Sequence, residues 1–200
     1  MEVNLSDAAW EAMYSPYDQP TYQAVLQLLK PEDIVLDIGA GDLRLSRQMA
    51  LIVNKVYAVE INSFVLEQGL TSCEPLPDNL IPIHADARAF DFPIDITVGV
   101  LLMRHCVHVP LYLEKLRRAG AGRLITNARW HMSAEAVNLK AERASFKKAG
   151  MGWYACLCGA IGFKEGPAEG WSIEMDGVIQ EVADCPQCTE FESPNFPELP

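Results

Sequence analysis

The 200-residue sequence lacks any long apolar run. Its longest such stretch, residues 96–103, is far shorter than the ~20 residues that a membrane-spanning helix needs. The first residues contain neither a basic region nor an apolar segment, so no secretory signal is recognised. These two absences predict a protein of the cytoplasm without a membrane partner.

Basic residues are scarce towards the C-terminus. The chain contains 16 Lys and Arg against 27 Asp and Glu, a net charge of −11. Residues 151–200 account for −8 of it, because Lys164 is their only basic residue. Such a segment repels phosphate backbones and anionic lipids. Nucleic acid is therefore expected to be an unlikely partner.

Short apolar runs alternate with segments of helical periodicity, which indicates βαβ units and a parallel sheet. The sequence predicts an α/β fold with a doubly wound, mostly parallel sheet in residues 1–150. Pro82 favours an edge position for the third strand. The expected strands are 34–38, 55–60, 80–84, 95–103 and 123–127, and the expected helices are 21–30, 43–52, 63–69, 110–118 and 133–149.

Three polar motifs follow three successive predicted strands, where ligands of doubly wound sheets bind. The first is Asp37-Ile-Gly39-Ala-Gly41, whose glycines permit a tight turn and close approach of a ligand. Glu60 ends the second strand and suits a pair of ribose hydroxyls, and Asp86 follows the third and suits an adenine amino group. The P-loop pattern is absent, and so is the third glycine of the dinucleotide motif.

In this order and spacing, the motifs resemble those of class I S-adenosylmethionine-dependent methyltransferases, over roughly residues 20–128. The resemblance implies an enzyme with S-adenosylmethionine as cofactor. It places Gly39 and Gly41 beneath the methionine part, Glu60 at the ribose and Asp86 at the adenine. Asp37, just before the loop, suits a cationic ligand. The chain departs from many members at Leu43, where they carry a third glycine.

Weaker similarities concern the substrate. Residues 15–21, 41–45 and 115–125 resemble a group of compact protein-lysine methyltransferases. The Asn/Asp-Pro-Pro-aromatic tetrapeptide of amide and adenine-amine methyltransferases is absent after the fourth strand, which argues against those acceptors.

The segment after the fourth strand contains the candidate catalytic residue. His105 is a candidate general base because histidine titrates near neutral pH, and His108 is a second one. The alternative is that both histidines form hydrogen bonds at the ends of structural elements. Tyr14 and Tyr17 are candidates to cover the cofactor, or simply pack on the domain.

Four of the six cysteines form two close pairs, Cys156/Cys158 and Cys185/Cys188. In a cytosolic chain such pairs indicate a metal site, here a closed structural Zn²⁺ site. Redox-active or unpaired thiols are the alternative. Asp176-Gly177 between two alternating runs predicts a hairpin. Residues 151–200 are therefore expected to form a small β-rich, zinc-ribbon-like segment with a loose acidic tail.

Three functions follow from these features. The first is methyl transfer to an amine, hydroxyl or thiol of a small molecule or protein. The second is a non-catalytic, methyltransferase-like binding or adaptor module. The third is an RNA methyltransferase that uses a basic helical face; four residues at helical spacing would form this face, Lys140, Arg143, Lys147 and Lys148. A solvated helix face is the alternative explanation for those residues.

Overall fold

A computed structural model of the chain describes residues 17–71, 75–104, 106–129 and 134–190. The chain divides into two compact units, residues 1–140 and residues 141–200. The boundary lies before the expected residue 150 because residues 141–149 bond to the second unit. The carbonyl of Ala144 accepts from the amide of Ala183 at 2.9 Å, for example, and the amide of Phe146 donates to the Asp184 carboxylate at 2.6 Å.

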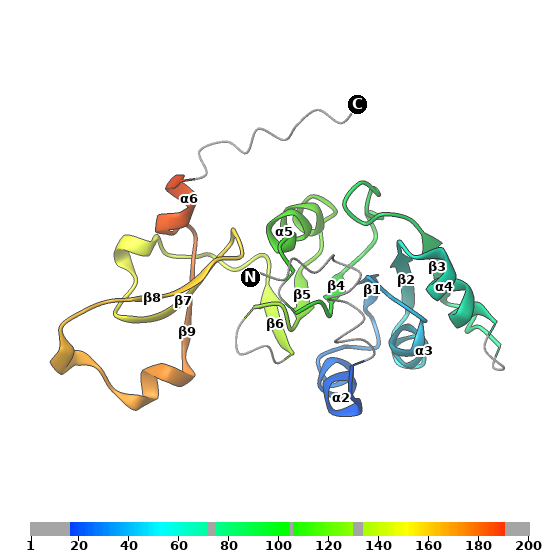
Figure 1. The fold of residues 1–200 in the computed structure, drawn as a ribbon, viewed down its shortest axis with the longest axis horizontal. Helices are drawn as coiled ribbons and strands as arrows, with labels where there is room; N and C mark the ends of the chain where they lie inside the picture. The colour runs from blue at the N-terminus through cyan, green and yellow to red at the C-terminus, as the bar shows by residue number, and fades with distance from the viewer. Residues whose placement is uncertain (1–16, 72–74, 105, 130–133, 191–200) are drawn as a thin grey trace, which may run out of the picture. The chain divides into compact units, whose positions relative to one another are not determined.

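The first unit is built on a six-stranded sheet of order β3-β2-β1-β4-β5-β6 (Figure 1). The first five strands along the chain are parallel, and β6 runs antiparallel to β5. The prediction of a doubly wound, mostly parallel sheet is confirmed, with β3 at one edge. The strands are β1 Ile34–Ile38, β2 Lys55–Glu60, β3 Leu80–His84, β4 Val98–Leu101, β5 Arg123–Thr126 and β6 Glu135–Asn138.

Among the described residues of this unit, one helix precedes the first strand and three connect strands, and two of the four begin at a capping side chain. The carboxylate of Asp18 accepts from the amide of Thr21 at 2.9 Å, and the side chain of Asn62 accepts from two amides of its helix. The helices are α2 Gln19–Gln27, α3 Arg44–Ala50, α4 Ser63–Leu70 and α5 Val109–Arg118.

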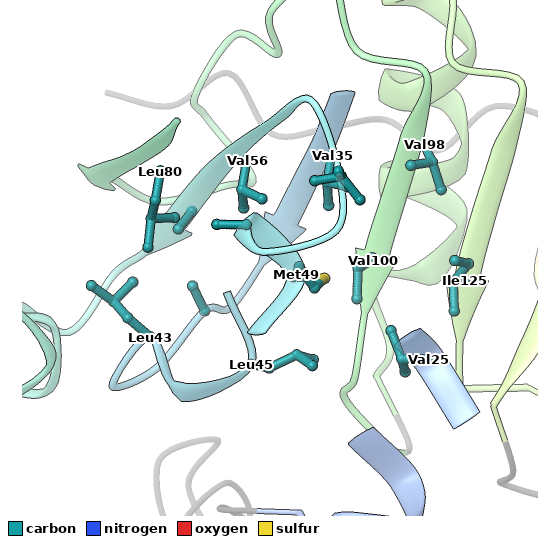
Figure 2. Packing of buried hydrophobic residues seen from close by; sticks show 14 of the residues in the cluster. Val25, Val35, Leu43, Leu45, Met49, Val56, Leu80, Val98, Val100 and Ile125 are labelled. Carbon is teal, nitrogen blue, oxygen red and sulfur yellow. The ribbon is translucent and has the colours of Figure 1, made fainter. Parts of the chain in front are cut away.

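Two hydrophobic clusters cover the two faces of the sheet. On one face α2 and α3 pack against the strands, with Val25 of α2 and Met49 of α3 fully buried (Figure 2). On the other face α5 contributes Leu113 and Leu116. Because the central strands are buried on both faces, they contain short apolar runs that are recognisable from sequence alone.

The predicted helix over residues 133–149 is wrong within its described part. Residues 130–133, with the expected N-cap Ser133, lie outside the described residues. β6 follows, and then a 3₁₀ turn at Phe146–Lys148. Val137 and Leu139 are both buried, so burial recurs at every second residue, as in a strand. This strand pairs with the open edge of β5. Pairing with this edge overrides the helical spacing of the charged residues.

The basic helical face expected from that helix therefore does not exist. Lys140 ends the first unit, and the other three residues belong to the second. Arg143 pairs with Glu181 at 3.1 Å through a guanidinium that is almost fully buried.

The second unit contains a three-stranded sheet of order β8-β7-β9, with β7 Gly152–Cys156, β8 Ile161–Lys164 and β9 Ile179–Val182. β7 and β8 form an antiparallel hairpin, and β9 runs parallel to β7. Short 3₁₀ segments at Ala168–Gly170 and Ile173–Gly177 precede β9, and the helix α6 Pro186–Glu190 follows it.

The hairpin predicted around Asp176-Gly177 is wrong. Only its second arm forms a strand, since Ile173–Gly177 is a 3₁₀ segment. The carboxylate of Asp176 accepts from the indole nitrogen of Trp153 at 2.9 Å, which fixes this segment against β7. Among the described residues, no helix is long and apolar enough to cross a membrane.

Candidate functional site

The loop after β1 is the centre of the candidate site. Gly39 and Gly41 have φ of +77° and +57°, the left-handed region that glycine adopts without strain. The amides of Gly39 and Ala40 donate to the carbonyl of Val59 at 2.9 and 3.0 Å, so the loop is bonded to β2. A Cβ on Gly39 would lie 2.8 Å from Cε of Met103, whereas a Cβ on Gly41 would meet nothing within 4 Å. The loop thus leaves open space in front of Gly41.

Glu60, at the end of β2, faces this loop and is 2% exposed. Its Oε2 accepts from the amide of Gly41 at 2.8 Å, and its Oε1 accepts from the amide of Asn62 at 2.7 Å. A carboxylate has about four lone-pair positions. Each oxygen of Glu60 therefore keeps acceptor capacity for a ligand hydroxyl after these two bonds.

Asp37 lies just before the loop and is 4% exposed. The hydroxyl of Ser46, in the first turn of α3, donates to Asp37 Oδ2 at 2.5 Å. Burial raises the pKa of Asp37 to about 6; the Ser46 bond opposes this shift, and the charge of Glu60 adds to it. Two buried carboxylates beside a glycine loop favour a cationic group over a phosphate. Sequence analysis missed Ser46, nine residues after Asp37.

Asp86 follows β3, and its immediate partner is Arg88. The amide and Nε of Arg88 both donate to Asp86 Oδ1 at 2.9 Å, and the ion pair measures 2.8 Å. This pairing holds the pKa of Asp86 below its ordinary value. The carboxylate is partly exposed and stands at the same edge of the sheet as Glu60, since β2 and β3 pair in parallel.

The ends of β4 and β5 form the other side of this edge. The amide of Arg104 donates to the hydroxyl of Tyr17 at 3.1 Å, and its guanidinium carbon lies 5.4 Å from the centre of the Tyr17 ring. Asn127, directly after β5, is fully buried. Neither its amide nitrogen nor its amide oxygen has a hydrogen-bond partner in the described part of the chain. Sequence analysis missed Asn127, for which no motif gave an indication.

The candidate base His105 and the aromatic Tyr14 lie outside the described residues, so their roles remain predictions. His108 is the residue before α5, and its ring lies 6.4 Å from that of Tyr112 in an edge-to-face arrangement. Its side chain does not cap the helix.

The second unit brings the four paired cysteines together, as their spacing predicted. The ligand atoms of Cys156, Cys158, Cys185 and Cys188 all lie within 4.8 Å of one another. Three sulfur pairs measure 3.5, 3.6 and 3.7 Å. Sulfurs held ~2.3 Å from a tetrahedral Zn²⁺ would lie ~3.8 Å apart. None of the four forms a disulfide.

The turn Leu157–Ala160 presents the first cysteine pair: the amide of Cys156 donates to Ala160, and Gly159 has a φ of +88°. The second pair lies at the start of α6, where the amide of Cys188 donates to Cys185 at 2.9 Å. Burial raises the pKa of Cys158 to about 11. A cation among the four sulfurs would favour the thiolates, which is the usual state of zinc ligands.

A parallel sheet of order 3-2-1-4-5, with a glycine loop and two acids at its carboxyl edge, is the arrangement of Rossmann-like methyltransferases. The residues fit S-adenosylmethionine in one observed respect, since Gly41 leaves open space directly beside the buried Glu60 carboxylate. The resemblance of the motifs to those of methyltransferases agrees with the name of a curated relative, which is a methyltransferase.

No family model matches the chain. It is 39% identical over 67 residues to ribosomal RNA small subunit methyltransferase A of Natranaerobius thermophilus, a match that covers 32% of this chain. The chain spans about a fifth of that relative's length, 21%.

Two solved structures are similar to the chain. One is a dimethyladenosine transferase from Plasmodium falciparum, 22% identical, with a TM-score of 0.47 over 55% of this chain and 41% of that one. The other is a SAM-dependent methyltransferase from Aquifex aeolicus, 16% identical, with a TM-score of 0.47 over 62% of this chain and 71% of that one.

The curated relative contradicts the expectation that nucleic acid is an unlikely partner, because its name describes a ribosomal RNA methyltransferase. The net charge misled because it is a sum over the whole chain and describes no single surface. Residues 1–140 have 12 Lys and Arg against 17 Asp and Glu, a net charge of −5, and residues 141–200 have 4 against 10, a net charge of −6. Nucleic-acid contacts depend on the local surface rather than on this sum.

Proposed function

We propose that the first unit binds S-adenosylmethionine and transfers its methyl group to RNA. The bond between Glu60 and the amide of Gly41 carries the cofactor part of this proposal. This hydrogen bond joins the glycine loop after β1 to the carboxylate at the end of β2. The two predicted cofactor motifs are therefore in direct contact. A plain turn between a strand and a helix would not need a buried carboxylate at this point.

Each residue has a defined part in this proposal. Gly41 provides open space for the methionine part, Glu60 accepts from the ribose hydroxyls, and Asp86 accepts from the adenine amino group. Asp37 provides negative charge near the amino group and the sulfonium. When bound, S-adenosylmethionine supplies an electrophilic methyl group. Holding the acceptor in line with that group supplies most of the rate enhancement in such a reaction.

The RNA acceptor is supported by the curated relative, which is named as a ribosomal RNA methyltransferase. The sequence interpretation gave a small molecule or a protein as the first choice and RNA as an alternative. The comparison favours the alternative, and no contact in the structure favours the first choice. The segment after β4 lacks the tetrapeptide of amide and adenine-amine methyltransferases. The atom of the RNA that receives the methyl group is therefore left open.

Asn127 and Arg104 are the residues that we assign to the acceptor side. The side chain of Asn127 is enclosed, so only a base inserted at this edge of the sheet would reach it. It offers a donor and an acceptor together, the pair that an asparagine uses on the edge of a base. Burial without a partner costs a polar group about 1–3 kcal/mol. Such a cost is typical of functional positions. Arg104 places a cation at the same edge, beside Tyr17.

The cofactor site is tested by calorimetric titration with S-adenosylhomocysteine. We expect binding by the wild-type chain and at least about a tenfold loss of affinity in Glu60→Gln, which keeps the shape of the side chain. Asp95→Asn is the matched control, because Asp95 pairs with Lys55 away from the site. A folded chain that shows no binding would contradict the proposal and favour the non-catalytic module.

The acceptor is tested with radiolabelled S-adenosylmethionine and deproteinised small-subunit ribosomal RNA. We expect label in the RNA, and a loss of transfer in Asn127→Leu at unchanged affinity for S-adenosylhomocysteine. Label in protein instead of RNA would support a protein acceptor. Cofactor binding without label in RNA, protein or small molecules would support an adaptor.

We also propose that the four cysteines of the second unit bind one Zn²⁺ in a structural role. Four protein sulfurs close the coordination sphere, which leaves no position for water or substrate. The sulfur spacing supports this proposal, and the cluster lies within a small core formed by Tyr154 and Val182. Redox-active thiols are the alternative, and zinc content separates the two.

A further inference from the structure

We propose that a pocket on the second unit binds an arginine side chain of a basic polypeptide. Six residues line this pocket: Met151, Phe163, Glu165, Gly166, Ala168 and Trp171. Its volume is about 250 Å³, below the 300–1,000 Å³ of sites that enclose a whole cofactor or drug. The size therefore fits one long side chain. The proposal is independent of methyl transfer.

The walls of the pocket are aromatic and apolar. Trp171 is 54% exposed, which is unusual for a tryptophan without a partner. Phe163 is held in place by Trp153, whose ring packs edge-to-face on it at 5.5 Å. The bond from the Trp153 indole to Asp176 fixes this pair further. A rigid aromatic wall beside an exposed tryptophan is the kind of surface on which a guanidinium stacks.

The glycine in the lining has a packing role. A Cβ on Gly166 would lie 2.6 Å from the sulfur of Met151 and 2.9 Å from its Cβ. Glycine lets the Met151 side chain lie against the backbone here, and both residues line the pocket.

The charge of the segment selects a cation. Glu165 is exposed, and no hydrogen bond or ion pair of its carboxylate is found among the described residues. Lys164 does not neutralise it, because Nζ of Lys164 donates to the carbonyls of Phe146, Lys147 and Ala149. Residues 151–200 carry −8 in total. RNA would meet repulsion here, whereas a basic segment would be attracted.

Two further apolar residues of the same segment are exposed. Ile173 and Val178 follow Trp171 in the sequence and are 68% and 61% exposed. Exposed apolar side chains in an acidic segment favour a contact with another protein. The occupant we infer is therefore a polypeptide with arginine as its anchor and apolar neighbours, and not a free amino acid.

The test uses the full chain and the acetylated, amidated peptide Gly-Arg-Gly-Arg-Gly in 150 mM salt. Binding is followed through the indole N–H resonance of Trp171 in ¹⁵N spectra. We expect this resonance to shift on titration. In the control peptide, citrulline replaces arginine and keeps the shape of the side chain but not its positive charge. We expect this peptide to bind at least about five-fold more weakly.

Two variants and one control locate the binding to the pocket. Glu165→Gln is followed through the Trp171 resonance, and Trp171→Ala through the indole N–H resonance of Trp153, which packs on Phe163. Each variant is expected to raise Kd about five-fold. Glu142→Gln removes the same charge at another exposed position of the unit, and we expect less than about a two-fold change. Equal effects of Glu165→Gln and Glu142→Gln, or equal binding of the citrulline peptide, would overturn the proposal. So would binding of a ten-nucleotide uridine RNA at the same resonance.

Discussion

Asp37 shows how one buried carboxylate couples the candidate cofactor site to pH. Its ordinary pKa is 3.8, and burial raises this to about 6. Between these two values the folded chain keeps a proton that the unfolded chain has lost. The contribution of Asp37 to the free energy of unfolding therefore falls as the pH rises from about 4 to about 6. Above this window the contribution is constant.

We compare the free energy of unfolding of the wild type with that of Asp37→Asn. Relative to the variant, we expect the wild type to lose about 3 kcal/mol of stability between pH 4 and pH 7. Urea denaturation at several pH values measures this difference. Asp95→Asn serves as a control: Lys55 lowers the pKa of Asp95, so that difference stays flat above pH 5. A flat difference for Asp37→Asn as well would show that Asp37 is not held as a buried acid.

The same residue has a functional consequence. At neutral pH Asp37 is mostly ionised, which suits a cationic cofactor. Affinity for S-adenosylmethionine should then weaken as the pH falls below about 6, and Asp37→Asn should remove this dependence.

Leu43 shows what a motif alone does not reveal. Its φ of +64° lies in the left-handed region, which costs a leucine about 1–2 kcal/mol. This conformation explains why many members of the methyltransferase family have a glycine at this position. Here the leucine is fully buried in the cluster of α2 and α3, and its burial offsets the strain. Sequence identified the departure from the family, but the conformation needed the structure.

At the scale of elements, Lys115 of α5 holds the segment after β3. Its Nζ donates to the carbonyls of Ala87, Arg88 and Phe90 at 2.8, 2.9 and 2.7 Å. It also lies 4.6 Å from the centre of the Phe92 ring. Residues 86–92 have no regular structure of their own. The lysine therefore fixes the segment that contains Asp86.

We expect Lys115→Met to lower the free energy of unfolding by about 1–3 kcal/mol, because three carbonyls lose their donor. Affinity for S-adenosylhomocysteine should fall as well, because Asp86 is no longer held in place. Arg118→Met on the same helix is the control, since Arg118 is 77% exposed and pairs only with Glu114; we expect a change within about 0.5 kcal/mol. Denaturation and calorimetry check both variants. Equal effects would contradict this role of Lys115.

The elements differ in how far sequence predicts them. The strands β1, β2 and β5 each contain an apolar run buried in the two clusters, so these residues identify the strands without reference to neighbours. β6 carries Glu135 and Asn138 and forms because β5 offers it an edge. The formation of β6 depends on pairing with β5, which lies outside residues 133–149. The periodicity within those residues alone therefore predicted a helix. The loop and Glu60 were found from spacing, whereas Asn127 required the packed structure.

For the whole molecule, the proposed metal site distinguishes the second unit from the first. Among the described residues, the second unit has few buried hydrophobic residues: Tyr154, Ala155, Cys156, Val182 and Cys185. Two of these are candidate zinc ligands. A core of this size does not offset the entropy of ordering about 50 residues without a further constraint. Structural Zn²⁺ supplies about 10–16 kcal/mol in small domains.

We therefore expect about one zinc per chain and selective unfolding of the second unit on chelation. The sulfur cluster lies entirely in residues 156–188, whereas Gly41 and Glu60 belong to the first unit. Titration with S-adenosylhomocysteine should be unchanged after chelation, while limited proteolysis should cleave residues 141–190. Cys158→Ser should lose the metal, and Cys106→Ser, a free cysteine of the first unit, should retain it. Metal-free protein that resists proteolysis in this segment would contradict the structural role, because the unit would then fold on its apolar core alone.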